Sequence, residues 1–254
     1  MSENEIYLHE YRSETYSGAM MIVGFPSIGL VSSIAANFII RTSKLERVAG
    51  LMSNSFPPYA FIHKGVPSPP VRIYAGERQC KDGEQCQQVV TVAAEFMPKP
   101  EQVRPLAERL LDYCSEKGIE TIVALEGINW PGNEEMEIFG AGSTNESREM
   151  LKKYGVEELK EGMVSGISGV LLFEGEVRGI NVICLLGPAR PNFPDARGSA
   201  KLLEIIAQML PEIKIDTGPL YKEAEEIENQ IRTAMESVNQ PKKLAAEDAT
   251  MIYG

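Results

Sequence analysis

Apolar runs of strand length alternate with amphipathic stretches along most of the chain. Each run is rich in β-branched residues and apolar at successive positions, which is typical of strands buried on both faces in a parallel sheet. The stretches between them place apolar residues three and four positions apart, the spacing of a helix with one buried face. Strands are expected at residues 18–25, 71–76, 88–96, 120–128 and 180–187, and helices at residues 30–42, 100–118, 145–155 and 195–210.

Two of these helices carry a signal at one end. Gly118 follows the second helix, where a glycine in the left-handed conformation commonly ends a helix. Asp195 precedes the fourth helix and is a candidate N-cap. Strands that alternate with helices predict a three-layer α/β domain with a largely parallel sheet over residues 1–218.

The pattern changes at Pro219, where apolar residues begin to recur at alternating intervals of four and three. This is the a/d seam of a coiled coil, about three heptads long, and two of its positions are alanine. We therefore expect a C-terminal helix over residues 219–238 that packs either on its own domain or against another subunit, where it would act in oligomerisation. The seam consists of Leu220, Ala224, Ile227, Ile231, Ala234 and Val238.

Residues 239–254 have too few apolar side chains to offset the entropy of ordering them. They include a proline, two lysines and several small polar residues, so a flexible tail is expected. Its first dozen residues can span roughly 40 Å when fully extended.

The chain carries 36 acidic and 25 basic side chains among 254 residues, a net charge of -11. This charge repels phosphate backbones and anionic lipid surfaces, so neither a nucleic acid nor a membrane is expected as a partner. Residues 1–11 lack the basic-then-apolar order of a secretory signal, and no apolar run reaches the ~20 residues that span a bilayer. A cytoplasmic location is expected.

The four cysteines show no Cys-x-x-Cys spacing, and the chain has two histidines, so no metal site is expected. Reduced thiols are the simplest interpretation. Asp82-Gly83 is a hairpin-turn signal between Cys80 and Cys86, which leaves a disulfide between these two cysteines open as an alternative.

The turn at residues 24–29, Gly-Phe-Pro-Ser-Ile-Gly, joins the first strand to the first helix. Backbone N–H groups at such a place bind phosphate in nucleotide-binding proteins. Neither the dinucleotide fingerprint nor the P-loop sequence is present, so a structural turn is favoured over a phosphate site, and no cofactor is expected.

Acidic residues gather near the end of the strand at 120–128 and in the loop after it. Glu126 and Asn129 are the best enzymatic candidates, because α/β enzymes keep their chemistry in loops at strand ends. No partner for acid–base or metal chemistry is tied to this loop by a motif. Solvated acids are the favoured interpretation, and the other carboxylates here are Glu134, Glu135 and Glu137.

Two further segments contain residue types that serve in catalysis or in anion binding. Ser168 lies in Ser-Gly-Ile-Ser-Gly, but both histidines precede it, whereas the nucleophile elbow of hydrolases has its histidine downstream. The glycine- and proline-rich loop at 187–198 contains Arg190 and Arg197, which either hold an anion or pair with the abundant acids.

Four blocks, in their order along residues 18–238, resemble the PAC2 family and its archaeal homologues of proteasome assembly chaperones. The resemblance implies a Rossmann-like α/β domain that self-associates and is not an enzyme, with no catalytic residue. The blocks begin at Ile22 (IVGFPSIGLVSSIAANFII), Ser55 (SFPPYAFIHKGVPSPPVRIYAG), Glu161 (EGMVSGISGVLLFEG) and Asp195 (DARGSAKLLEIIAQML).

The resemblance also gives a role to the last three residues, Ile252, Tyr253 and Gly254. Archaeal members of the family carry a C-terminal hydrophobic-Tyr-any motif that enters pockets between α-subunits of the 20S proteasome. It implies that this chain is a proteasome assembly chaperone or activator that forms a homo-oligomer, a tetramer or a pentamer. The alternatives are a small-molecule enzyme of nucleotide or amide type that uses the acidic loop at 126–137, and an adaptor whose tail binds another partner.

Overall fold

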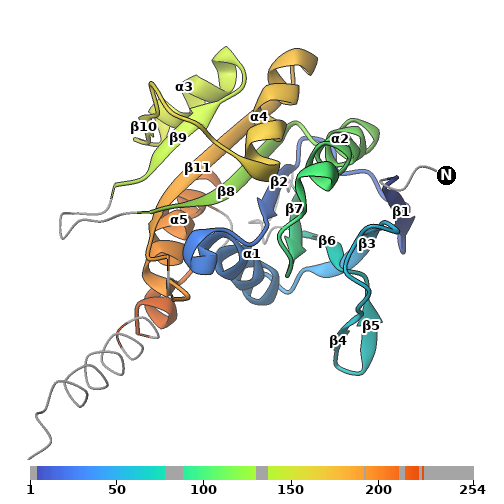
Figure 1. The fold of residues 1–254 in the computed structure, drawn as a ribbon. Coiled ribbons are helices and arrows are strands. Elements are labelled where there is room, and N and C mark those ends of the chain that lie inside the picture. The colour runs from blue at the N-terminus through green and yellow to red at the C-terminus, as the bar shows by residue number, and fades with distance from the viewer. Residues whose placement is uncertain are drawn as a thin grey trace, which may run out of the picture.

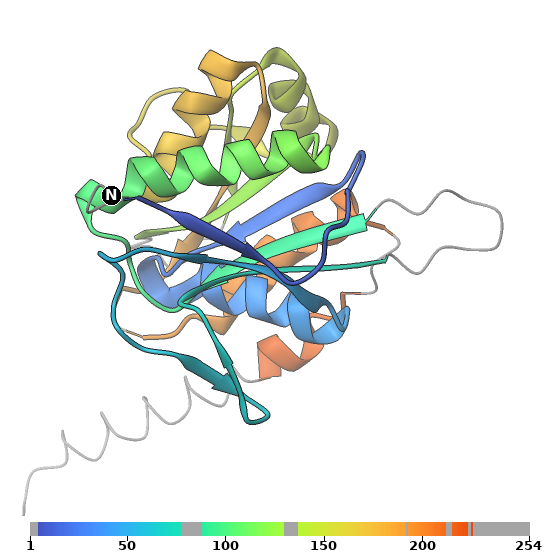
Figure 2. The ribbon, with the colours of Figure 1, turned by 90° about the vertical axis from the view of Figure 1, so that its right-hand side faces the viewer.

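The computed structural model describes residues 5–77, 88–129, 137–191, 193–211, 215–222 and 225. Within them the chain forms a nine-stranded sheet covered by helices on both faces, and a two-stranded hairpin that projects from one side (Figures 1 and 2). The three-layer α/β architecture expected from the sequence is confirmed.

The sheet has the strand order β1-β3-β6-β7-β2-β8-β11-β9-β10. Strands β7, β2, β8 and β11 are parallel and form its centre, while β1, β3, β6 and β9 join antiparallel to their inner neighbours. Edge strand β10 runs parallel to β9. The strands are β1 Tyr7–Glu10, β2 Met20–Gly24, β3 Glu46–Met52, β6 Val71–Glu77, β7 Gln88–Ala94, β8 Thr121–Asn129, β9 Phe139–Gly142, β10 Glu157–Glu158 and β11 Asn181–Ala189, and the hairpin is β4 Phe61–His63 with β5 Val66–Ser68.

Helices α2 and α4 lie on one face of the sheet, and α1 and α5 lie on the other (Figure 2). Helix α3 packs on β9 and β11 and contributes Leu151 to the core on the α1 and α5 side. The bounds are η1 Ile28–Leu30, α1 Val31–Thr42, α2 Pro100–Lys117, α3 Asn145–Lys153, α4 Gly166–Arg178 and α5 Ala196–Met209.

The expected helix ends are present. Gly118 has a φ of 73° and donates its N–H to the carbonyl of Cys114, so it ends α2 in the left-handed conformation. The Asp195 side chain accepts a hydrogen bond of 2.9 Å from the N–H of Gly198, which makes it the N-cap of α5.

Three features differ from the sequence-based expectations. The strand expected at 71–76 exists as β6, but it is antiparallel to both neighbours; its position between β3 and β7 buries both faces whatever its direction. Helix α4 was not expected, because its apolar residues do not keep to one face. Strands β1, β3, β9, β10 and the hairpin were also missed, and most of them are short or partly exposed.

The helix expected at 219–238 is described only at residues 218–222 and 225, which are helical. Leu220 is buried in the core beside α5, and the Tyr221 hydroxyl donates a 2.6 Å hydrogen bond to Glu204 of α5. The first turn therefore packs on its own domain, and residues 226–238 lie outside the described part of the chain. None of the described helices is long and apolar enough to cross a membrane.

Candidate functional site

Parallel α/β sheets bind ligands at the carboxyl ends of their strands, which in this protein include the ends of β2, β8 and β11. Here the turn between β2 and α1 packs against that edge. A Cβ atom on Gly127 of β8 would lie 2.3 Å from the carbonyl oxygen of Ile28. Gly29 adopts a φ of 62°, and a Cβ on it would lie 3.0 Å from the carbonyl oxygen of Arg190. The turn at 24–29 is thus a packing element, in agreement with the structural turn favoured from the sequence.

The hydroxyl groups of this turn bond to the protein itself. The Ser27 and Ser32 hydroxyl oxygens lie 2.6 Å apart, and Ser32 also donates to the carbonyl of Phe25. Both serines are buried. These side chains therefore stabilise the strand-to-helix connection by satisfying its buried polar groups.

Replacing Gly127 with alanine is expected to destabilise the fold by about 2 kcal/mol or more, because the added methyl overlaps a backbone carbonyl. Urea denaturation of both proteins measures this change. Asn129→Ala, at the exposed end of the same strand, is the control and should stay within about 0.5 kcal/mol of wild type. Equal stability of the Gly127→Ala and wild-type proteins would contradict the close packing of the turn.

Glu126 lies on the face of β8 covered by α4. The Ser168 hydroxyl, in the first turn of α4, donates a 3.0 Å hydrogen bond to its carboxylate. Burial raises the pKa of Glu126 to about 7, and the hydrogen bonds from Ser168 and from the Gly127 backbone oppose that rise. The side chain is partly buried, so this carboxyl group titrates near neutral pH.

None of the other enzymatic candidates that the structure describes is placed beside Glu126. Strand β8 continues to Asn129, and side chains three positions apart in a strand point to opposite faces, so Asn129 faces away from Glu126. Glu137 is described and exposed, whereas Glu134 and Glu135 lie outside the described residues. The two best enzymatic candidates therefore lie on opposite faces of β8.

The loop at 187–198 is held by its own charges. The Arg190 Nε atom lies 4.0 Å from the Asp195 carboxylate, and its backbone N–H donates to the same carboxylate at 3.1 Å. The Arg197 guanidinium lies over the Tyr221 ring at 5.7 Å. Of the two roles considered for these arginines, Arg190 takes the ion pair with an acid.

Neither histidine lies near Ser168, which is in the first turn of α4 over β8. His9 lies in edge strand β1, which four strands separate from β8, and His63 lies in the β4–β5 hairpin. The described residues also contain no group of three or more His, Cys, Asp or Glu side chains that could hold a metal ion. The hydrolase interpretation therefore has no support in this geometry.

The structure describes two of the four cysteines, Cys114 and Cys184. Cys114 and Cys184 are free and buried, and burial raises the pKa of both thiols, which keeps them protonated and unreactive. Cys80 and Cys86, the candidate disulfide, lie outside the described residues. The proposed anchor, Ile252, Tyr253 and Gly254, also lies outside them.

Comparison with known proteins decides the family. The model of the PAC2 family matches residues 21–235. The chain belongs to the PAC2 family. The resemblance found in the sequence blocks is thereby confirmed.

Curated relatives and solved structures match this chain over most of its length. An uncharacterized protein of Methanocaldococcus jannaschii is 33% identical over 221 residues, 87% of each chain. PbaA of Pyrococcus furiosus, described as an archaeal homolog of proteasome-assembly chaperone, is 30% identical with a TM-score of 0.78, covering 91% of this chain and 92% of PbaA. PbaB of the same organism, described as an archaeal proteasome activator, is 25% identical with a TM-score of 0.79, covering 91% and 99%.

This PAC2 domain carries a surface on α4 that sequence reasoning missed. Phe173 and Val177, one helical turn apart, are 53% and 67% exposed, and Met163 just before the helix is 91% exposed. The opposite side of α4 buries Ile167 and Leu171. A helix that is apolar on both sides is the signal that could have indicated a second contact surface.

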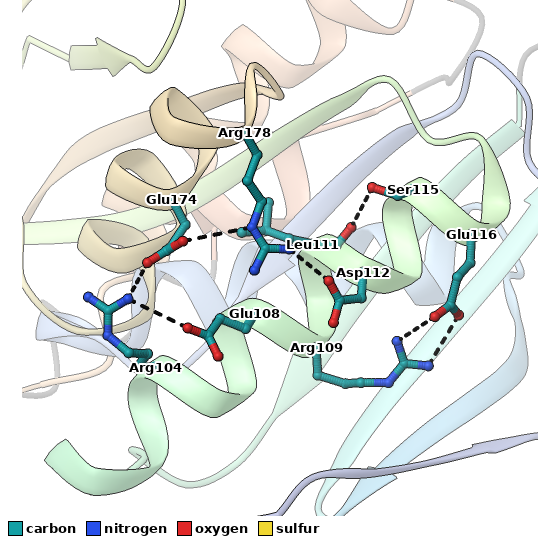
Figure 3. Close-up of polar contacts among 9 residues, drawn as sticks. All are labelled: Arg104, Glu108, Arg109, Leu111, Asp112, Ser115, Glu116, Glu174 and Arg178. Atoms are coloured by element: carbon teal, nitrogen blue, oxygen red, sulfur yellow. Dashed lines mark hydrogen bonds and ion pairs between the residues drawn. The ribbon is translucent and has the colours of Figure 1, made fainter.

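Ion pairs on α2 and α4 border this surface (Figure 3). Arg104 pairs with Glu174 and, at 3.5 Å, with Glu108. Arg178 lies 2.7 Å from Asp112. The Arg104–Glu174 and Arg178–Asp112 pairs cross between the two helices and hold α4 against α2, although exposed pairs of this kind add little stability individually.

Proposed function

We propose that this chain is a proteasome assembly chaperone or activator, which docks its C-terminal tails into pockets between α-subunits of the 20S proteasome. The observation that carries the proposal is the similarity to PbaA over 91% of this chain. The sequence Ile252-Tyr253-Gly254 supports it further, because it fits the hydrophobic-Tyr-any motif.

Each tail residue contributes a different interaction. The Gly254 carboxylate pairs with a lysine in a partly desolvated pocket, where a charge-assisted hydrogen bond is strong. Tyr253 supplies a rigid ring with a polar tip, the type of side chain that dominates many small interfaces. Ile252 adds about 1.5–3 kcal/mol if it is fully enclosed.

Three residues bind weakly alone, so the proposal requires several tails on one particle. A homo-oligomer, a tetramer or a pentamer, raises the effective concentration of each further tail once the first is bound. Residues 239–254 act as the tether that lets the tails reach their pockets, and residues 219–238 set where the tethers begin. We place this activity in the cytoplasm.

The proposed activity needs no catalytic residue and no cofactor. Burial raises the pKa of Glu126, but Asn129 lies on the other face of β8, and the turn at 24–29 packs against the strand ends. We therefore assign Glu126 no chemical step.

Binding of the full-length chain and of a chain ending at Met251 to purified 20S proteasome tests the proposal. Surface plasmon resonance should show binding for the first and none for the second. Light scattering and thermal melting should give the same mass and midpoint for both, since the removed residues lie far along the chain from the core. Equal binding by the shortened chain would contradict tail docking.

A further inference from the structure

We call the apolar side chains on the outer side of α4, together with Met163 just before the helix, the α4 patch: Met163, Leu172, Phe173 and Val177. Leu172 is partly buried, and the other three are exposed by more than half of their surface. Gly169 allows the residues before α4 to lie against its first turn, because a Cβ on it would lie 2.2 Å from the Val164 carbonyl oxygen. The segment that carries Met163 is thereby held next to the helix.

A hollow of about 340 Å³ adjoins the α4 patch. It lies between α4 and the corner where β9 leads into α3, and Gly142 and Gly169 form part of its lining. Leu172 and Phe173 form part of its wall, with Arg148 and Glu176 at its border. One face thus presents both protruding apolar side chains and a recess beside them.

Charged groups surround the apolar centre in nearly equal numbers. On the α2 side, Arg104 holds its guanidinium 5.8 Å from the centre of the Phe173 ring and also pairs with Glu174. The border contains three arginines and four carboxylates, a near balance on a chain whose total charge is -11. They are Arg104, Arg148 and Arg178 with Glu108, Asp112, Glu174 and Glu176.

An apolar centre with a charged rim is the usual anatomy of a protein interface. Two copies of this chain repel each other through their net negative charge, except where a surface carries both signs. The balanced border lets a second copy approach and pair opposite charges around the apolar centre. The adjacent recess can receive an apolar side chain of that copy.

We infer that the α4 patch is the contact through which copies of this chain associate. The inference rests on the proposed function, which requires several tails on one particle, and it names the surface that joins the subunits. Helices α2, α3 and α4 supply the charged border, and α4 supplies the apolar centre of the contact.

The test is the solution mass of the full-length Val177→Glu protein, measured by light scattering after size exclusion. Wild type should have a multiple of the 28.0 kDa chain mass, and the variant should have a lower mass than wild type. Ile62→Glu, on the hairpin, is the matched control, because Ile62 is 62% exposed and Val177 is 67% exposed. The control should keep the wild-type mass.

A folded Val177→Glu protein with the wild-type mass would overturn the inference, as would a monomeric wild type. The milder variant Val177→Ser should raise the concentration at which the oligomer dissociates by at least about tenfold, and no change would count equally against the patch. The same measurements distinguish the two proposals. If wild type is oligomeric but does not bind 20S proteasome, only the proposed function is contradicted. If wild type binds 20S proteasome and the Val177→Glu protein keeps the wild-type mass, only the α4 contact is contradicted.

Discussion

Replacing Tyr253 with alanine is expected to weaken binding to 20S proteasome by about thirtyfold per tail, which corresponds to about 2 kcal/mol. Truncation removes the aromatic ring that we propose as the main anchor. Because several tails act together, the loss for the whole oligomer should exceed the loss for one tail. Surface plasmon resonance on immobilised proteasome measures both the affinity and the dissociation rate, and the change should lie mainly in dissociation.

Two variants in the same tail separate anchoring from general effects of the sequence. Tyr253→Phe keeps the ring and should retain most of the affinity. Lys243→Ala changes a residue well before the anchor and should bind as wild type does. If Tyr253→Ala matched wild type, or if Lys243→Ala lost as much as Tyr253→Ala, the tyrosine would not be the anchor.

Replacing Glu126 with glutamine is expected to stabilise the protein above neutral pH by on the order of 3 kcal/mol. The pKa of Glu126 is raised from 4.5 to about 7 by burial, so the folded state holds this proton more tightly than the unfolded state does. The stability that follows is fully present below about pH 4.5 and is lost as the pH rises through about 7. Glutamine has no charge to bury and can still accept the Ser168 hydrogen bond.

Urea denaturation at about pH 5 and about pH 8 measures this linkage. The difference between wild type and Glu126→Gln should widen from the lower pH to the higher one, with the variant the more stable at pH 8. Glu120→Gln, an exposed carboxylate just before β8, is the control and should show no such widening. A constant difference across this range would mean that Glu126 is ionised in the fold without penalty.

The central parallel strands were predictable because burial on both faces leaves long apolar runs in the sequence. Helices α1, α2, α3 and α5 were predictable because each has one buried face, and two of them carry end signals at Gly118 and Asp195. Helix α4 was not, because it buries Ile167 and Leu171 while it exposes Phe173 and Val177, so no single apolar stripe marks it. The antiparallel direction of β6 could not be predicted either, because a strand buried on both faces has the same apolar pattern in a parallel and in an antiparallel pairing.

The surroundings of the enzymatic candidates could not be predicted from the sequence. Glu126 was named as an enzymatic candidate because it ends a predicted strand, and solvated acids were the favoured interpretation; burial raises its pKa instead, so that interpretation is wrong for Glu126. Asn129 was named on the same ground, but the strand continues through that position and turns the two side chains to opposite faces. Ser168, the hydrogen-bond partner of Glu126, lies 42 residues away and becomes its neighbour only when α4 packs over β8.

The position of the terminal carboxylate tests the central claim most directly. A chain lengthened by two glycines after Gly254 keeps every residue of the tail and the whole folded domain, but it moves the carboxylate away from Tyr253. We expect this protein to have the wild-type mass and no measurable binding to 20S proteasome, while the unextended chain binds. Equal binding by the two chains would contradict docking through a carboxylate-terminated anchor.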